Sequence, residues 1–343
     1  MNFPTFARSL LGFAGLALAG AAQGNCDIPP QARLAPPTVD GKPVKVNAEF
    51  TLVDLIAIKD VDETFTADLV FTLDWRDARL AAAARGGSLE GCRVGADDVW
   101  HPDLGSINRR DLTFIFGPRV SIDSDGNVHY KVRAFGDFSN RLDLRDFPFD
   151  SQALRVRVAS FQYGPDVVDL VGRAVARGDL SDFALAGWEV KRSFIDAGVT
   201  PAQVGAERFS RLDYVIEVRR EARYYLWNFV VPLVCIVLMA WTVFWLDPQA
   251  AGVQIGIATA SAFTLVAFLV ALRGRLPPVP YLTRMDELIL AATALVFIAL
   301  AQAVLTSRLA QVEKHALAKR LDAYGRWVYL AGFGIVLYVT LIR

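Results

Sequence analysis

Residues 226–246 read LWNFVVPLVCIVLMAWTVFWL, an apolar stretch without a single charged side chain. A helix of about 20 such residues crosses the ~30 Å hydrocarbon layer of a bilayer. Three further uncharged runs follow, at 248–272, 288–307 and 327–342, and the last of them is short for a span. The chain therefore predicts a membrane domain over 223–343, and a soluble enzyme is excluded. We expect the helices at about 224–246, 251–272, 284–307 and 326–342.

The composition excludes several other classes of function. The 343 residues carry 36 basic and 36 acidic side chains, so the formal net charge is zero. This balance gives no reason to expect a nucleic-acid partner. The three histidines, His101, His129 and His315, are scattered, and the sequence has neither a glycine-rich phosphate loop nor a metal-ligand spacing. We therefore expect no catalytic residues, no metal and no cofactor.

The N-terminus predicts export. Arg8 precedes the short apolar stretch Leu10–Ala22, which ends in small residues. This pattern is typical of a cleaved secretory signal, here residues 1–24, with an uncleaved anchor helix as the alternative. Cleavage predicts that the charged half lies outside the cytoplasmic membrane. Cys26 and Cys92 both fall in that half, where disulfides persist, and whether they pair stays open.

Residues 25–222 have the pattern of strands rather than helices. Apolar and polar side chains alternate over short stretches, most clearly at 65–75, 154–158 and 214–218. The segment DSDGN at 123–127 predicts a hairpin turn. Apart from one short helix near 78–85, no helical period is visible. We therefore expect a β + α membrane protein, with an extracellular antiparallel β-sandwich followed by a four-helix transmembrane bundle.

The second apolar run differs from the other three. It mixes glycine, alanine and small hydroxyls with one amide. Polar groups in a membrane helix face protein or water rather than lipid. Gln254, Ser261 and Leu265 fall on one helical face. Such a face is typical of a tight helix interface or of a pore lining, and from this helix alone both interpretations stay open.

Four motifs in order carry a resemblance to a known family. They are DLRDFPFDSQ (143–152), YYLWNFVVP (224–232), WTVFW (241–245) and LPPVPYLT (276–283), the last followed by Asp286. The first is similar to the signature loop of the Cys-loop receptors without its two cysteines, and the second has the proline of their first membrane helix. The chain thus resembles the prokaryotic pentameric ligand-gated ion channels. FGDFSN at 135–140 looks closer to the amine-gated, ELIC-like bacterial type than to the proton-gated type.

The resemblance implies a homopentamer in a bacterial inner membrane, multi-pass, with the sandwich in the periplasm. Each subunit would lend its second membrane helix to a pore for ions. A small-molecule agonist, with amines and protons both open, would bind between neighbouring sandwiches. The alternative is a membrane-anchored periplasmic binding or sensor protein that does not conduct, which would give no current in a bilayer.

The resemblance also implies the ligand-binding residues. The segments 100–108 and 160–163, together with the stretch before Phe209, occupy the family's principal-face loops. The ligand-binding residues implied are Phe161, Tyr163, Phe209, Phe194, Ile107 and, on the complementary face, Arg119. Aromatic rings hold an ammonium by cation–π attraction. However, Ala159 stands where the amine-gated type has an acidic residue, and Gly105 replaces another. The resemblance therefore does not by itself imply an amine agonist, and amines and protons both stay open.

At the domain boundary the resemblance implies a coupling role for the signature loop. The residues implied are Asp60, Phe147, Pro148, Phe149, Asp150, Arg219 and Pro277. We expect Phe147 and Phe149 to wedge against the helices, and Arg219 to pair with Asp150 and Asp60. An ion cluster that only stabilises the fold is the alternative, and the two roles are compatible.

The pore register stays open by two residues. Counting forward from Trp245 places on the axis Gln254, Ala258, Ser261, Leu265 and Phe268. Counting back from Pro277 places there Gly256, Ala260, Phe263, Ala267 and Val270. We favour the first register because it turns an amide and a hydroxyl toward water and gives an apolar gate. The resemblance leaves charge selectivity open: Asp247 lies near the cytoplasmic mouth, where the family's cation channels carry a glutamate, while Arg273 and Arg275 at the outer end would repel cations. Between the two, we favour a weakly cation-selective channel.

Overall fold

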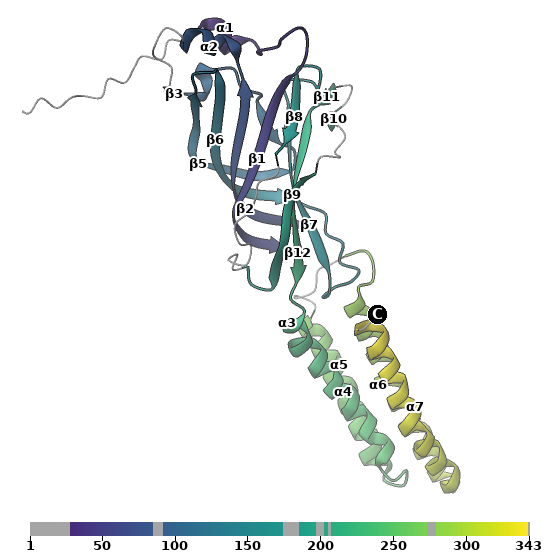
Figure 1. Ribbon diagram of the computed structural model, residues 1–343. Coiled ribbons are helices and arrows are strands. Elements are labelled where there is room, and N and C mark those ends of the chain that lie inside the picture. The colour runs from purple at the N-terminus through teal and green to yellow at the C-terminus, as the bar shows by residue number, and fades with distance from the viewer. Residues whose placement is uncertain are drawn as a thin grey trace, which may run out of the picture.

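Two layers of β-strands form the N-terminal half of the molecule, and the helices run away from one end of it (Figure 1). This computed structural model describes residues 28–84, 92–173, 185–196, 202–204, 207–272 and 279–341. The predicted signal peptide 1–24, Cys26 and Pro277 lie outside the described residues, as does the side chain of Cys92, so a disulfide between the two cysteines stays a prediction.

The two layers are a six-stranded sheet in the order β3-β5-β6-β2-β1-β8 and a four-stranded sheet in the order β4-β7-β12-β9. Strands β10 and β11 form a separate pair. The expected sandwich is confirmed, and its paired strands are antiparallel except β1 and β8, which run parallel. The strands are β1 Val44–Lys59, β2 Thr64–Arg76, β3 Cys92–Val94, β4 Leu104–Ser106, β5 Arg109–Ile122, β6 Asn127–Ser139, β7 Ser151–Ser160, β8 Val168–Gly172, β9 Trp188–Asp196, β10 Ala202–Val204, β11 Glu207–Phe209 and β12 Arg211–Arg220.

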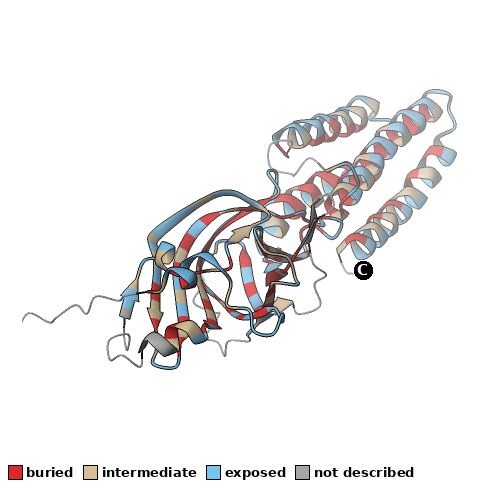
Figure 2. Cartoon of the chain, turned by 90° about the horizontal axis from the view of Figure 1, so that it is seen from above, coloured by how far each residue is buried: buried red, intermediate tan, exposed pale blue. Residues whose placement is uncertain are grey.

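The period-two pattern of the sequence explains the core between the sheets. In β7, Leu154, Val156 and Val158 are buried while Arg155 and Arg157 point out of the core. Figure 2 shows the same alternation of buried and exposed residues along other strands. The largest fully buried side chains include Phe50, which stacks on Tyr214 at a centroid distance of 5.5 Å. These apolar faces hold the sheets together.

Local sequence also fixes the turns and short helices. The predicted hairpin joins β5 to β6, where the Asp123 carboxylate accepts the backbone N–H groups of Asp125 (2.9 Å) and Asn127 (2.8 Å). Gly126 takes a φ of +78°, which a side chain would oppose. The predicted alanine-rich helix is α2, Ala78–Ala84, and a further short helix, α1, covers Pro30–Leu34.

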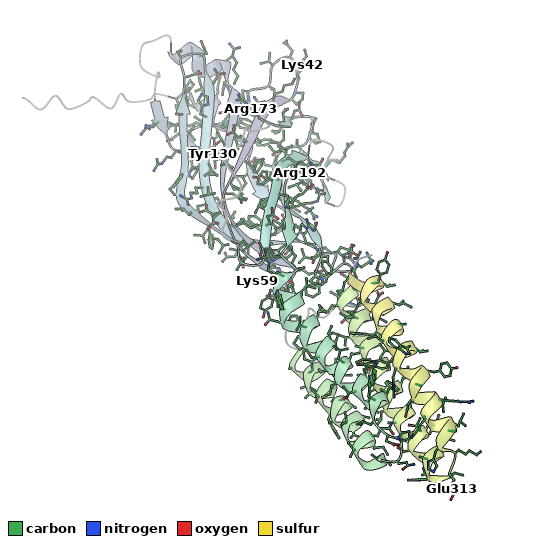
Figure 3. The ribbon with its side chains drawn as sticks, turned by 60° about the horizontal axis from the view of Figure 1, so that its bottom comes forward. Lys42, Lys59, Tyr130, Arg173, Arg192 and Glu313 are labelled. Carbon is green, nitrogen blue, oxygen red and sulfur yellow. The ribbon has the colours of Figure 1, made fainter. Side chains whose placement is uncertain are left out.

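Among the described residues, four helices are long and apolar enough to cross a membrane. The first combines α3 (Arg223–Tyr225), a π-helical turn (Leu226–Val230), α4 (Val231–Trp241) and a 3₁₀ turn (Thr242–Trp245). The others are α5 (Ala251–Leu272), α6 (Arg284–Gln311) and α7 (His315–Leu341). In Figure 3, Lys59 marks the junction with the sandwich and Glu313 marks the far end of the bundle.

The fourth helix begins at His315, so the prediction that it starts near residue 326 was wrong. The residues before 326 form an amphipathic helix, in which Ala318 and Asp322 are buried one turn apart while Lys319 and Arg320 are exposed. The exposed charged residues of this segment were interpreted as the sign of a loop. Helix α6 begins at Arg284, and its cap explains this start: Thr283 Oγ1 accepts the N–H of Asp286 (3.1 Å), and Asp286 accepts the N–H of Thr283 (3.0 Å).

Candidate functional site

Where the sandwich meets the helices, Arg220 joins two segments of the sandwich that are far apart in sequence. Its Nε donates to Asp150 Oδ1 (2.7 Å), and its Nη1 and Nη2 donate to Asp60 (2.7 and 3.0 Å). Asp60 lies in the turn after β1, and Asp150 ends the signature loop. The guanidinium therefore ties both to β12, the strand that leads into the first membrane helix.

Aromatic rings enclose this cluster. The Arg220 guanidinium lies 4.0 Å from the Trp188 ring centroid and 4.8 Å from that of Phe147. Burial alone would lower the pKa of Arg220, but the hydrogen bonds that it donates to Asp60 and Asp150 raise it above its ordinary value. A buried charge of this kind is held only by its partners.

The expected pairing through Arg219 was wrong. Asp60 and Asp150 do come together, but around the next residue along the strand. In β12, Val218 and Arg220 are buried while Glu217 and Arg219 turn outward. Side chains of a strand point alternately to its two faces, so a one-residue error exchanges the inner position for the outer one. Arg219 instead lines, with Phe149 and Glu189, an open cavity of about 350 Å³.

The signature loop touches two membrane helices. Phe147 is buried edge-on against Tyr225 of α3, at a centroid distance of 4.7 Å. Its peptide bond to the buried Pro148 is cis. The loop also reaches the start of α6, where Arg284 Nε donates to Asp146 (2.8 Å) and the N–H of Leu144 donates to the Tyr281 hydroxyl (2.9 Å). The loop is thus a mechanical contact between the domains.

The ligand residues expected from the sequence are only partly brought together. Phe161 and Phe209 form one pair, with ring centroids 5.7 Å apart. Tyr163 packs instead on Trp100, at 5.5 Å. The remaining three lie at other places: Ile107 follows β4 and is partly exposed, Phe194 in β9 stacks under Arg192, and Arg119 in β5 stacks on Phe116.

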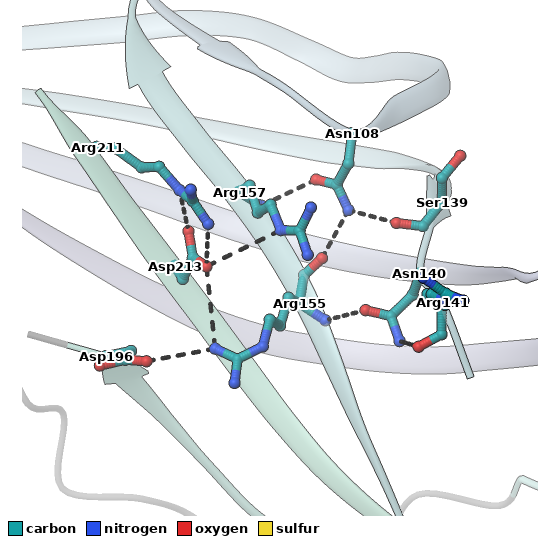
Figure 4. Close-up of polar contacts among 9 residues, drawn as sticks. All are labelled: Asn108, Ser139, Asn140, Arg141, Arg155, Arg157, Asp196, Arg211 and Asp213. Carbon is teal, nitrogen blue, oxygen red and sulfur yellow. Dashed lines mark hydrogen bonds and ion pairs between the residues drawn. The ribbon is translucent and has the colours of Figure 1, made fainter. Parts of the chain in front are cut away.

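Beneath the aromatic pair lies a group of arginines that the sequence analysis missed. Arg211 grips Asp213 with two hydrogen bonds (2.7 and 2.6 Å), and Arg155 reaches Asp196 at 3.3 Å (Figure 4). Arg157 approaches Asp213 only to 3.9 Å. Its buried Nε has no hydrogen-bond partner among the described residues. We call Arg155, Arg157 and Arg211 with Asp196 and Asp213 the arginine face.

Asn108 fixes the backbone behind this face. Its side-chain amide donates to the carbonyls of Ser139 and Arg155 (both 2.7 Å), and its oxygen accepts the N–H of Arg157 (3.0 Å). One amide therefore bridges β6 of one sheet and β7 of the other. In the sequence, Asn108 cannot be distinguished from an ordinary loop asparagine, so its bridging role was not predicted.

Helix α5 packs on its own subunit through the face that the favoured register placed on a pore axis. Gln254, Ala258, Ser261 and Leu265 are each 0% exposed, and Phe268 is half-buried. That register is therefore wrong, since a pore-lining side chain must point away from its own subunit. The other register is outward along its whole length: Gly256, Ala260, Phe263, Ala267 and Val270 are all exposed.

Comparison with known proteins is consistent with this arrangement. Residues 31–222 match the family described as the neurotransmitter-gated ion-channel ligand binding domain. Residues 229–326 match the neurotransmitter-gated ion-channel transmembrane region. The chain belongs to the neurotransmitter-gated ion-channel family. It is thus a multi-pass membrane protein with an extracellular domain.

Two relatives within this channel family show how far the likeness extends. A proton-gated ion channel of Gloeobacter violaceus is 28% identical over 266 residues, which cover 77% of this chain and 73% of that channel. A gamma-aminobutyric acid receptor subunit beta-4 of Gallus gallus is 25% identical over 275 residues, covering 77% of this chain and 55% of the receptor subunit. The nearer likeness to the amine-gated bacterial type stays a prediction.

In this member of the channel family, the amide of Gln254 belongs to a polar cluster inside the helical bundle. Gln254 Nε2 donates to Asp322 Oδ2 in α7 (3.3 Å), and its Oε1 accepts from Ser307 in α6 (3.1 Å). Gln302 donates to the other oxygen of Asp322 (3.4 Å). The cluster links α5, α6 and α7 near the far end. The sequence signal that could have revealed this cluster is Asp322, a lone aspartate on the buried face of α7.

Removing the carboxylate of Asp322 is expected to loosen this end of the bundle. Asp322→Leu strands the amide donors of Gln254 and Gln302, and interhelical hydrogen bonds in membranes contribute about 1–2 kcal/mol. We expect the free energy of unfolding of the detergent-solubilised protein, measured by thermal denaturation, to fall by a corresponding amount. Asp322→Asn keeps an acceptor oxygen and is expected to lose less. The matched control is Asp247→Asn, since Asp247 is half-exposed; equal losses for all three variants would contradict the role of the cluster.

Proposed function

We propose that the chain is one subunit of a homopentameric ion channel, lined by α5 and opened by a small-molecule agonist that binds at the sandwich. The observation that carries the proposal is the outward face of α5. The residues of this face, from Gly256 to Val270, are apolar, and no helix in the described part of the subunit covers them. Phe263, for example, is 72% exposed. Five such faces around an axis would bury one another's edges and enclose a narrow apolar pore.

The junction supports gating by the sandwich. Agonist binding would displace β12 relative to the signature loop, and both elements are held by Arg220. Because Phe147 contacts Tyr225 and Asp146 contacts Arg284, a displacement there would reach the first and third membrane helices together. An apolar constriction at Phe263 would conduct only when it widens enough to stay hydrated.

The ends of the pore would set its charge preference. Asp247, just before α5, has a side chain that is 52% exposed and lies 3.8 Å from Lys319. A ring of partly compensated carboxylates favours cations weakly. We therefore propose a weakly cation-selective channel in the inner membrane of a bacterium, with the sandwich in the periplasm.

Currents from the purified full chain in a planar bilayer test this function. We expect agonist-dependent currents when pH is varied and when amines and carboxylates are added singly. The Arg220→Gln protein in the same bilayer serves as the control and is expected to stay silent. The solubilised protein should have the mass of five copies. A monomer without current under every condition would instead support a membrane-anchored sensor.

A further inference from the structure

Near the end of the bundle that Glu313 marks in Figure 3, an arginine and two tryptophans join the first and fourth membrane helices. The Arg326 guanidinium of α7 lies 4.4 Å from the ring centroid of Trp245. Its Nε donates to the backbone carbonyl of Phe244 (2.8 Å), and Trp241 Nε1 donates to the backbone carbonyl of Arg326 (2.9 Å). The two indole rings pack edge to face, with centroids 5.5 Å apart. We call Trp241, Trp245 and Arg326 the tryptophan platform.

The platform holds the guanidinium through Nε and leaves its two outer nitrogens available. Among the described residues, Nε is the guanidinium atom of Arg326 that makes a hydrogen bond, and Nη1 and Nη2 make none. Asp322, one turn earlier in α7, attracts the charge of Arg326 without forming a salt bridge with it in the described part of the chain. The Asp322 oxygens instead accept the amides of Gln254 and Gln302. Four N–H donors of Arg326 can therefore bind a ligand.

Positive charge predominates at this end of the bundle. The segments 242–251 and 306–326 contain five basic and three acidic side chains, namely Arg308, Lys314, Lys319, Arg320 and Arg326 against Asp247, Glu313 and Asp322. Asp322 is buried inside the bundle, and Asp247 lies 3.8 Å from Lys319. A ligand that approaches from the membrane therefore meets an excess of positive charge, which favours an anion.

The surroundings of the platform are those of a membrane interface. Trp245, Tyr324 and Trp327 are exposed, and amphipathic rings of this kind collect where hydrocarbon meets headgroups. Arg326 lies one turn, about 6 Å, deeper along α7 than Asp322. A guanidinium at such a depth is costly unless water or a headgroup reaches it. Of the four described spans, α7 has the smallest buried share, so lipid can approach this helix.

We propose that the tryptophan platform binds an anionic phospholipid, whose phosphate accepts hydrogen bonds from Nη1 and Nη2 of Arg326. A guanidinium presents its donors in a fork that matches two phosphate oxygens. Trp245 fixes the plane of that fork, and its exposed ring gives the acyl chains an apolar surface. Lys319, two turns earlier on the same helix face, adds attraction for the negative charge. A zwitterionic lipid has the same phosphate, but its ammonium is repelled by the basic side chains. The proposal needs helices in a membrane and does not depend on conduction.

Three probes test the ligand chemistry: dioleoyl phosphatidylglycerol, dioleoyl phosphatidylcholine and sn-glycerol 3-phosphate, which has no acyl chains. Each is titrated into the delipidated full chain in an uncharged detergent, and the rise in Tm with concentration gives the affinity. We expect phosphatidylglycerol to stabilise the protein at the lowest concentration, phosphatidylcholine to need about tenfold more, and glycerol phosphate to have no effect in that range.

Substitutions then locate the site. Arg326→Gln should weaken phosphatidylglycerol binding about ten- to a hundredfold, the usual effect of a charge-assisted hydrogen bond, and Arg326→Lys should weaken it less. Trp245→Leu removes the ring without touching the bond from Arg326 to Phe244, and should weaken binding several-fold. Arg320→Gln is the matched control, because it removes the same charge from an exposed position of α7 outside the platform and should bind as the wild type does.

Four results would overturn the proposal. The first is equal stabilisation of the wild type by phosphatidylglycerol and phosphatidylcholine, and the second is stabilisation by glycerol phosphate as strong as by the lipid. The third is an equal loss of affinity in Arg320→Gln, which would indicate unlocalised attraction to surface charge. The fourth is wild-type affinity in both Arg326→Lys and Trp245→Leu. These two variants decide the matter if Arg326→Gln does not fold.

Discussion

Replacing Arg220 by glutamine is expected to abolish agonist-evoked current and to destabilise the sandwich. The substitution leaves two carboxylates without their counter-charge, and the side chain of Asp150 is only 2% exposed. Removing one partner of a buried ion pair costs about 3–5 kcal/mol, because the other charge stays buried. Thermal unfolding of the solubilised protein measures the loss of stability, and bilayer currents measure the loss of gating.

The neighbouring arginine provides the matched control. Arg219→Gln changes an exposed side chain on the opposite face of the same strand, so we expect its stability to stay within about 0.5 kcal/mol of the wild type. Arg220→Lys keeps the charge but loses the fork, and a folded Arg220→Lys channel with a shifted dose response would separate coupling from folding. If Arg219→Gln silences the protein and Arg220→Gln does not, the assignment is reversed.

Phe263→Ser is expected to give a leaking channel. Phe263 is the largest side chain on the outward face of α5, and five of them would meet near the axis. A hydroxyl in that place keeps water in the constriction, which stabilises the conducting state. Leu265→Ser should act differently, because Leu265 is 0% exposed. Truncating a buried leucine costs about 2–5 kcal/mol, so we expect lower expression or stability without leak.

Cysteine scanning along α5 reads the same face without depending on a gate. In a Cys235→Ala background, a water-soluble thiol reagent should modify positions on the outward face and block current. The positions expected to react are 256, 260, 263, 267 and 270. Reaction at 254, 258, 261 and 265 instead would contradict the packing of this helix, and reaction without a helical period would contradict a pore along α5.

Secondary structure followed from short-range patterns wherever one pattern dominated. The strand at 65–75, the turn at 123–127 and the helix at 251–272 were predicted because alternation, turn chemistry or an uncharged run left a single interpretation. The start of α7 was missed because residues 315–326 combine exposed charges, such as Lys319 and Arg320, with a buried face that includes Ala318. A hydropathy window averages over that face and reads the whole segment as polar.

The site was predicted less well, because its errors depend on contacts between distant segments. Gln254 was expected to face water because it is polar, but Ser307 and Asp322 form hydrogen bonds with its amide inside the protein. Deciding between Arg219 and Arg220 required knowing which residues of β12 face the core. The consecutive buried residues in the earlier part of this strand hide the alternation that would show it. Arg157 and Arg211 meet only through the register of β7 with β12. The sequence alone contains no sign of that register.

The position of Asp322 along α7 relates the bundle to the thickness of the bilayer. From Asp322 to the end of the helix at Leu341, a rise of 1.5 Å per residue gives roughly 29 Å. That is close to the ~30 Å of an average hydrocarbon core. The carboxylate and its amide partners thus lie near the interface, where a charge is tolerated. A thicker membrane would draw them into hydrocarbon unless the helix straightened, and a thinner one would tilt it. Hydrophobic mismatch would then act on α5 directly, through Gln254.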